Sequence, residues 1–230
     1  MIELFLSIAS IAFTVLVYMG ARFVHMRFPH PLTLPLLIGT IFIISFLLLF
    51  RIPYEVYEAG GRWIEELLGP AVVALAYPLY RQMSLLKKYF FSILTGVMIG
   101  SIVGVISGFW LASWLGVEQE LVHSIVPKSV TTPVAMDVTA YLNGNPPFAA
   151  LFVIIAGIGG VLLAPTVFRW CKITHTLGKG IGMGTASHAV GTAKALENSE
   201  KEGAASSIAM TLSAIIVSIL APALVFILQS

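Results

Sequence analysis

The sequence has few charged residues and a single cysteine. Only 10% of its 230 residues are Asp, Glu, Lys or Arg, whereas 58% are hydrophobic and the mean hydropathy is +0.95. This balance lies far from that of a soluble globular domain and predicts a polytopic membrane protein. The 13 basic and 11 acidic residues nearly cancel, which argues against a broad basic surface for nucleic acid. Cys171 stands alone, which excludes an intrachain disulfide and a metal site with several cysteines.

Sequence motifs of common hydrolases are missing as well. The chain contains no His-Glu-x-x-His and no Gly-x-Ser-x-Gly, and Ser187 directly precedes His188, a spacing that does not imply a nucleophile facing its base. The glycine-rich run before Thr185 has no Gly-Lys-Ser/Thr ending, so it is not a nucleotide-binding loop. We therefore expect no enzyme activity, no catalytic residue, no cofactor and no bound metal.

Long apolar runs make up most of the chain. Five of them approach the ~20 residues that a helix needs to cross a bilayer: Leu4 to Met19, Leu32 to Phe50, Phe90 to Leu115, Phe148 to Phe168 and Ile208 to Leu228. The first has no basic residue before it and no small-residue cleavage motif after it, so we expect a retained span rather than a signal peptide. Three weaker segments are interrupted by Gly, Pro or polar residues: Trp63 to Tyr80, Leu121 to Leu142 and Ile181 to Leu196.

Basic residues indicate the orientation. The positive-inside rule places in the cytoplasm the clusters Arg22 and Arg27; Arg81, Lys87 and Lys88; and Arg169, Lys172 and Lys179. We therefore expect a multi-pass protein of the plasma (cytoplasmic) membrane, also called the cell inner membrane. Its N-terminus would lie on the outer side. Arg51 and Lys128 depart from this arrangement. On these sides Trp63 to Tyr80 must cross, Leu121 to Leu142 dips in from outside, and Ile181 to Leu196 dips in from the cytoplasm.

The predicted fold is thus an all-α polytopic bundle of about six full transmembrane helices plus two opposed broken or re-entrant helices. Each broken segment precedes a span rich in small residues, and both spans carry an Ala-Pro near the far end. This pattern predicts an inverted repeat of the kind found in secondary transporters. The alternative is that any two membrane hairpins of similar composition look alike. Glycines spaced four apart from Gly96 to Gly108 favour close helix packing over a role in lining a pore.

The first broken segment reads IVPKSVTTPVAMDVTAYLNG from Ile125 to Gly144. Thr131 or Thr132 can cap a helix from Pro133 to about Leu142, where Asn143-Gly144 would end it. The unpaired amides at this N-terminus favour a carboxylate or phosphate. Lys128 adds a cation, and hydroxyl donors come from Ser129, Thr131 and Thr132. The plainer alternative is that Lys128 snorkels to the headgroups and the hydroxyls only cap backbone.

Asp137 is the only aspartate in the chain and follows Pro133 by about one turn. It could relay a proton or form a salt bridge with Lys128. The sequence does not distinguish between these two roles of Asp137.

The second broken segment reads GKGIGMGTASHAVGTAKAL from Gly178. Its glycines permit a tight entry, and Thr185 and Ser187 can cap a short helix and donate to an anion. His188 could donate a hydrogen bond or carry a coupled proton, or it could simply bridge two helices. Gly191 and Thr192 follow on the same short helix.

Three stretches, PAVVALAYPLY (Pro70 to Tyr80), PKSVTTPVAM (Pro127 to Met136) and GTASHAVGTAKALE (Gly184 to Glu197), resemble the LrgB/CidB family. The resemblance covers nearly the whole chain. It implies an antiholin-like regulator of murein hydrolase export and autolysis that works with a small LrgA/CidA-type membrane partner. It also implies transport, since a fused plastid form resembles a glycolate/glycerate transporter and bacterial relatives are linked to pyruvate and other small carboxylates.

Carried over residue by residue, the resemblance implies binding positions in both motifs. They are Lys128, Ser129, Thr131, Thr132 and Pro133 in the first and Thr185, Ser187, His188, Gly191 and Thr192 in the second. The earlier stretch would place Pro70 and Tyr77 near the same cavity, although its apolar character fits packing equally well. Asp137 lies just beyond the first motif.

Together, these features predict one LrgB-like membrane domain over residues 1–230, with N-terminal spans in 1–115 and two broken-helix-plus-span units in 116–230. We expect a transporter of small monocarboxylates such as pyruvate, glycolate or acetate, coupled to protons through Asp137 or His188. The alternative is an antiholin-like regulator acting through an LrgA/CidA-type partner. A homodimer is expected, with the Gly96 to Gly108 face or the first two spans as its interface.

Overall fold

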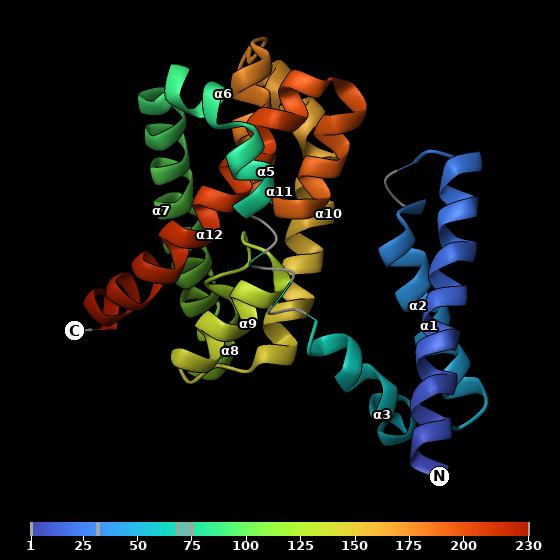
Figure 1. The fold of residues 1–230 in the computed structure, drawn as a ribbon. Coiled ribbons are helices and arrows are strands. Elements are labelled where there is room, and N and C mark those ends of the chain that lie inside the picture. The colour runs from blue at the N-terminus through green and yellow to red at the C-terminus, as the bar shows by residue number, and fades with distance from the viewer. Residues whose placement is uncertain (1, 31–32, 68–69, 71–72, 74–75, 230) are drawn as a thin grey trace. The chain divides into compact units, whose positions relative to one another are not determined.

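The computed structural model describes residues 2–30, 33–67, 70, 73 and 76–229, in two compact units, Met1–Ala71 and Val72–Ser230. Every regular element in this described part is a helix, which confirms the predicted all-α class (Figure 1). The boundary between the units lies well before residue 115, where the two parts of one domain were predicted to meet. Whether the two units act as a single domain remains a prediction.

The first unit contains α1 (Ile2–Arg27), α2 (Pro35–Leu49) and α3 (Tyr54–Glu65). Polar contacts hold α3 against the N-terminal half of α1, where the Ser7 hydroxyl donates to the Ala59 carbonyl at 2.9 Å. Gly60 makes this close contact possible, because a Cβ there would lie 2.5 Å from the Ser7 carbonyl oxygen. Phe13 of α1 packs on Phe46 of α2 with ring centroids 4.7 Å apart.

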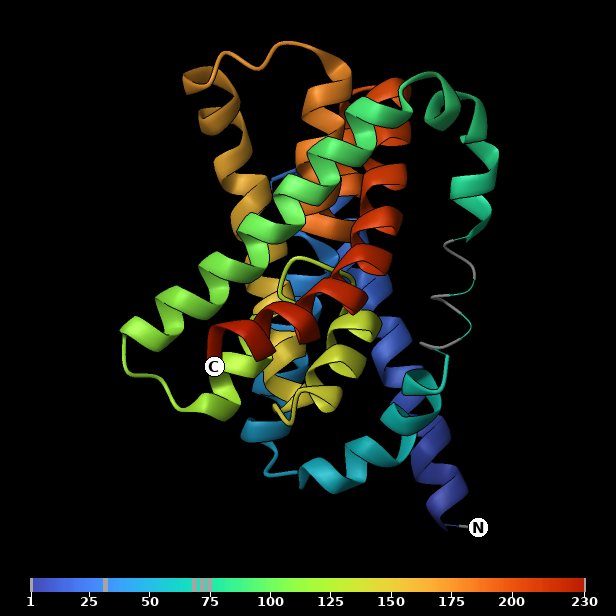
Figure 2. The same ribbon diagram turned by 90° about the vertical axis from the view of Figure 1, so that its left-hand side faces the viewer.

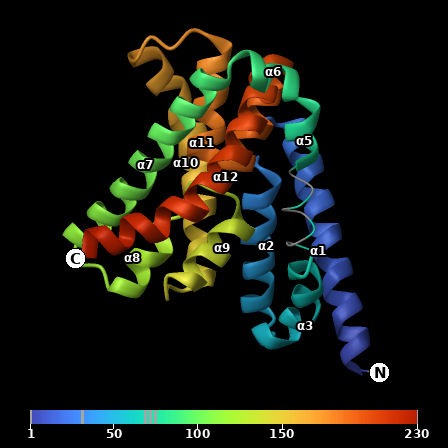
Figure 3. The same cartoon turned by 60° about the vertical axis from the view of Figure 1, so that its left-hand side comes forward.

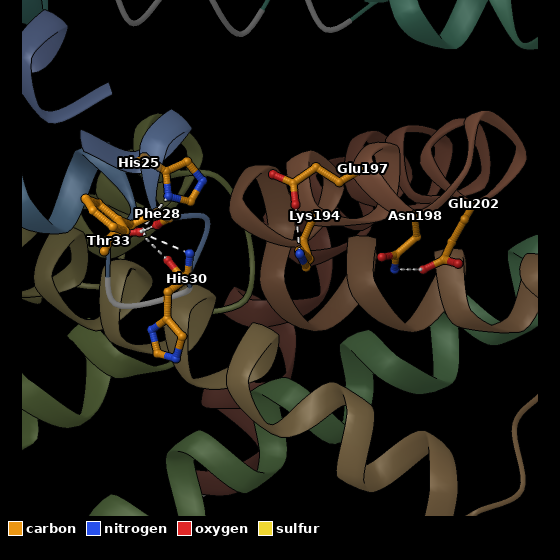
Figure 4. Close-up of polar contacts among 8 residues, drawn as sticks. All are labelled: His25, Phe28, His30, Thr33, Lys194, Glu197, Asn198 and Glu202. Carbon is orange, nitrogen blue, oxygen red and sulfur yellow. Dashed lines mark hydrogen bonds and ion pairs between the residues drawn. The ribbon is translucent and has the colours of Figure 1, made fainter. Parts of the chain in front are cut away.

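The turn between α1 and α2 is organised by Thr33. Its hydroxyl lies 2.9 Å from Nδ1 of His25, 2.6 Å from the Phe28 carbonyl and 2.7 Å from the His30 carbonyl (Figure 4). One short side chain thus lies within hydrogen-bonding distance of several polar groups at the end of α1, and its single proton can be donated to one carbonyl at a time.

The second unit contains α5 (Ala76–Arg81), α6 (Met83–Lys88), α7 (Phe90–Trp114), α8 (Gln119–Ile125), α9 (Thr132–Tyr141), α10 (Pro146–Trp170), α11 (Thr176–Asn198) and α12 (Glu200–Gln229). Figures 2 and 3 show α7, α10 and α12 as its long helices, with α8 and α9 at the end where α7 stops and α10 begins. Apolar side chains of α7, α9, α10 and α12 form the largest buried cluster.

α8 and α9 form a re-entrant segment. Near its entrance the Asn145 amide, at the start of α10, donates to the Ser124 hydroxyl at 2.7 Å. Residues 126–131 then carry the chain inward, and α9 returns it to the start of α10. The segment predicted over Leu121 to Leu142 is therefore a broken helix that enters and leaves at one end of the unit.

α11 is a second re-entrant segment, bent back on itself at His188, whose φ of 42° and ψ of −128° interrupt the helix. Gly191 lies against the Met183 carbonyl, so the two arms run side by side. The outer parts of both arms, Lys179 in one and Lys194 in the other, line the same cavity. Both arms therefore end where α10 stops and α12 begins.

The two re-entrant segments enter from opposite ends, because α10 connects one to the other across the unit. Each is followed by a long helix, α10 after the first and α12 after the second, and each long helix contains an internal proline, Pro165 and Pro222. The order and the opposed directions match the predicted inverted arrangement.

The number of full spans differs from the prediction of about six. Among the described residues, four helices are long and apolar enough to cross a membrane: Leu4–Arg27, Phe90–Trp114, Pro146–Trp170 and Glu200–Leu228. α2 has 15 residues, because Pro35 begins it and the chain turns just after Leu49, where Arg51 adopts a φ of 50°. For the predicted Trp63 to Tyr80 span, α3 ends at Glu65 and α5 begins at Ala76, while positions 68–69, 71–72 and 74–75 lie outside the described residues.

Candidate functional site

The two predicted motifs meet at the middle of α7. A Cβ built on Gly100 would lie 2.7 Å from Cγ2 of Thr185, and one built on Gly104 would lie 3.4 Å from Oγ of Ser129. These glycines are one helical turn apart, a rise of about 6 Å. Because α7 runs from Phe90 to Trp114, the contact lies near its midpoint. The tips of both re-entrant segments therefore lie side by side, deep within the unit.

Lys128 lies against the next turn of α7. Its Nζ donates to the Gly104 carbonyl at 2.7 Å, and a Cβ at Gly108 would lie 2.7 Å from the same nitrogen. The glycine face of α7 thus allows close packing, as predicted. Its four glycines, in order along the helix, contact side chains of the same chain: Ile181, Thr185, Ser129 and Lys128. This face is therefore occupied and cannot form the dimer interface for which it was a candidate.

The helix predicted from Pro133 is α9, with Thr131 in the N-cap position, Pro133 in its first turn and Asn143 at a φ of 57° after its end. The structure confirms the predicted boundaries to within about one residue. Thr131 thus takes the N-cap position predicted for Thr131 or Thr132, but its hydroxyl makes no capping bond and is buried without a hydrogen-bond partner among the described residues. Thr132 lies half-buried in the first turn. The N-terminal amides of α9 and the Thr131 hydroxyl thus lie together at the tip.

The break in the second segment comes later than predicted. Thr185 and Ser187 lie in the last turn of the first arm of α11, before the break at His188, rather than at the N-terminus of a short helix. The glycines before them are accommodated in a continuous helix, since Gly180 and Gly184 face the backbone of α12 at Glu202 and Ser206. The chain reverses instead at His188, in a conformation that non-glycine residues rarely adopt.

His188 and Ser187 pack against α10. The Nε2 atom of His188 lies 3.0 Å from the Val153 carbonyl, so this ring bridges two helices, as the plainer alternative expects. A Cβ at Gly157 would lie 2.7 Å from Nε2, and Gly160 faces the Ser187 hydroxyl. Sequence reasoning did not assign these two glycines to the site, although their run of small residues in the span after the first motif was a usable signal.

Three hydroxyls of the predicted site are buried and have no hydrogen-bond partner in the described part of the chain: those of Thr131, Thr185 and Ser187. Their residues are 8%, 5% and 1% exposed. Leaving a buried hydroxyl unpaired costs about 1–3 kcal/mol, so native proteins rarely keep such groups without a function. A fourth unpaired hydroxyl, on Thr139, lies near Ser124 and Gly144 at the other end of α9.

Other predicted residues have structural partners. The Thr192 hydroxyl donates to the His188 carbonyl at 2.8 Å and lies 2.9 Å from Oγ of Ser206. Gly191 packs against the opposite arm of the hairpin. These residues hold the bend in place and do not present free polar groups.

Asp137 is exposed on α9. The salt bridge between Lys128 and Asp137 is not among the ion pairs of the described residues, and Lys128 bonds the Gly104 carbonyl instead. The proton-relay role of Asp137 remains a prediction. Tyr77 on α5 is also largely exposed, and half of the Pro70 to Tyr77 stretch, positions 71–72 and 74–75, lies outside the described residues.

Comparison with known proteins assigns the sequence to a family. Residues 14–227 match the LrgB-like family. The chain belongs to this family. It is 46% identical to YxaC of Bacillus subtilis (strain 168) over 221 residues, 96% of each chain. It is 42% identical to YwbG of the same organism over 219 residues, 95% of this chain and 97% of the relative.

A further relative of this LrgB-like chain is the holin-like protein CidB of Staphylococcus aureus (strain N315), 37% identical over 223 residues, 95% of this chain and 96% of CidB. No solved structure matches the sequence. The family match and the apolar helices together show a multi-pass membrane protein.

Proposed function

We propose that this LrgB-like protein binds and transports small monocarboxylates of the pyruvate, glycolate or acetate type. The observation that carries the proposal is that the hydroxyls of Thr131, Thr185 and Ser187 are buried without partners in the described chain, on two re-entrant segments that both pack against the middle of α7. A carboxylate offers acceptor oxygens to several donors at once, and charge-assisted hydrogen bonds of this kind are about twice as strong as neutral ones.

The surrounding charges favour an anion. The N-terminus of α9 and that of the second arm of α11 each present unpaired amides with a partial positive charge. Lys128 adds a full charge, and no described ion pair neutralises it. Its ammonium group bonds a helix carbonyl at 2.7 Å, from which a rotation of the flexible side chain would bring it to a bound carboxylate.

The opposed segments support transport rather than simple binding. Non-helical backbone persists at membrane depth only where it is buried in protein or lines a cavity. Segments that enter from opposite ends and meet near the middle of the long helices give each side of the membrane its own route to one site. We infer that protons couple the flux through His188 or Asp137, and that the N-terminus lies outside.

The second candidate is an antiholin-like regulator of murein hydrolase export and autolysis, working as a homodimer or with an LrgA/CidA-type partner. Its specific support is the name of the 37% identical relative, holin-like protein CidB. The relatives' names favour this candidate and carry no information on carboxylates. The two candidates are compatible if autolysis responds to carboxylate flux.

Uptake of labelled pyruvate, glycolate and acetate into proteoliposomes tests the proposal, with and without an imposed pH gradient. We expect saturable uptake that Lys128→Ala abolishes and that Lys201→Ala, which removes the same charge from an exposed position, leaves unchanged. Uptake that requires an added LrgA-like protein would make the chain one subunit of a transport complex. No uptake in either condition would favour the regulator.

A further inference from the structure

A cavity of about 820 Å³ lies at the open end of the α11 hairpin. The C-terminal part of α10, both arms of α11 and the first turn of α12 line it. Its polar lining includes Arg169, Lys172, Lys179, Lys194, Asn198 and Glu202. The sequence assigned the first three of these cations only to membrane orientation.

The lining is strongly basic, with four cations against one carboxylate. Lys194 is paired with Glu197 at 2.7 Å, and Glu202 accepts a hydrogen bond from Asn198 at 2.9 Å (Figure 4). Arg169, Lys172 and Lys179 take part in none of the ion pairs that the described residues show. Positive charge thus converges on a concave space, which membrane orientation alone does not require.

The inner end of the cavity adjoins the candidate site. Met183 and Val161 line it and belong to one buried apolar cluster. Met183 is two residues before Thr185, and Val161 follows Gly160, which faces the Ser187 hydroxyl. Along the chain, this apolar cluster therefore adjoins both the basic cavity and the residues that carry or face the unpaired hydroxyls of Thr185 and Ser187.

We propose that this cavity is a vestibule that attracts small free carboxylates electrostatically and delivers them past Met183 to the bend of α11. This inference rests on the proposed function and adds to it the entry route and its selectivity for anions. In a concave site, like charges focus the local field and raise the local concentration of counter-ions.

Reaction rates of a thiol placed in the vestibule test the field without requiring transport. Thr174 lines the cavity and is exposed, so we choose Thr174→Cys in a Cys171→Ser background, reconstituted in neutral-lipid liposomes. A negatively charged and a neutral methanethiosulfonate reagent are compared. In both reactions the thiolate attacks the sulfenyl sulfur, a disulfide forms and sulfinate leaves, so their rate ratio cancels any effect of nearby lysines on the thiolate fraction.

We expect the rate ratio of the anionic to the neutral reagent to exceed that of a free thiol. This ratio should fall about fivefold when Lys172→Gln and Lys179→Gln are combined, and it should also fall in high salt. The matched control is Lys88→Gln with Lys201→Gln, which removes the same charge from a separate cavity between α6 and the start of α12 and should leave the ratio unchanged. An unchanged ratio in the Lys172/Lys179 variant would overturn the vestibule.

Two further measurements distinguish a lipid headgroup from a free carboxylate as the bound anion, and failure of the vestibule from failure of the transport proposal. If added anionic phospholipid removes the preference while pyruvate at about 10 mM, roughly tenfold above the usual range of KM, does not protect the thiol, the occupant is a lipid headgroup and the free-anion route is wrong. Protection by pyruvate supports the route. If the charge preference persists but no condition gives uptake, the transport proposal fails while the anion-attracting cavity stands.

Discussion

The buried hydroxyls of the candidate site differ in whether they have a hydrogen-bond partner. Those of Thr131, Thr185 and Ser187 are buried without partners in the described chain, whereas the Thr192 hydroxyl bonds the His188 carbonyl and lies beside Ser206. An unpaired buried hydroxyl destabilises the fold, and a paired one stabilises it modestly. Substitution by an apolar residue of similar shape should therefore have opposite effects at the two kinds of position.

We expect Thr185→Val to unfold at a temperature equal to or above that of the parent, while losing most pyruvate uptake. Thr192→Val should lose about 1 kcal/mol of stability, because it also leaves Ser206 without this partner. Thermal unfolding in detergent and uptake in proteoliposomes measure the two effects. A destabilised Thr185→Val would show that this hydroxyl has a structural partner instead.

Gly108 lacks a side chain where the ammonium group of Lys128 lies. We expect Gly108→Ala to reduce uptake as strongly as Lys128→Ala does, because the added methyl would lie 2.7 Å from Nζ and displace it. Stability should fall by only about 1 kcal/mol, since the group within 3 Å is the end of a flexible side chain and the Ile125 carbonyl oxygen, at 3.3 Å, has little distance to move. Gly159→Ala is the control, because a Cβ there meets no atom within 4 Å. Normal uptake by Gly108→Ala would mean that the position of Lys128 does not matter.

At the scale of elements, the α11 hairpin depends on glycines that face backbone rather than side chains. Gly184 faces the Ser206 carbonyl of α12, which cannot move aside, whereas Gly182 faces the ring of Phe168 at 3.4 Å. Overpacking against backbone typically costs about 1–3 kcal/mol. We expect that loss for Gly184→Ala and almost none for Gly182→Ala, measured by thermal unfolding. Equal stability of the two variants would contradict the close packing of α11 on α12.

At the bend of α11, two substitutions distinguish the role of the His188 ring from the role of its backbone conformation. His188→Ala removes the bond to Val153 and keeps the unfavourable φ of 42°, whereas His188→Gly removes the same bond and relieves the backbone. Glycine should therefore be more stable than alanine here by about 1 kcal/mol, the reverse of their order in a regular helix. Both variants should lose uptake if the ring carries the coupled proton. Uptake retained by His188→Gly alone would assign only a backbone role to this residue.

At the scale of the whole molecule, the predicted orientation places the end of α10 in the cytoplasm and the start of α8 outside. In intact cells, a membrane-impermeant thiol reagent should label Glu118→Cys in a Cys171→Ser background. The same reagent should reach the exposed native Cys171 only after permeabilisation. The reverse pattern would invert the topology and with it the side on which the vestibule opens.

The fold class and the two opposed segments were predictable because their signals are local. Proline at position 133 and Asn143-Gly144 mark both ends of α9, and polar residues within apolar sequence mark both motifs. The bend at His188 was not predictable, since a strained backbone at a non-glycine residue has no sequence signature. Nor was the meeting of both motifs on α7, because it depends on contacts between residues far apart in the chain. Likewise, α2 is shorter than its apolar run suggests.

The reversal of α11 has one more consequence. The last carbonyls of its first arm and the first amides of its second arm end at the same point, so opposite partial charges of two helices meet there. An anion held at the amides and a coupled proton on the His188 ring would neutralise each other. Together they would add little net charge to the fixed charge of Lys128, so loading the site would be nearly insensitive to the membrane potential, which otherwise acts with about 2.3 kcal/mol per charge for every 100 mV.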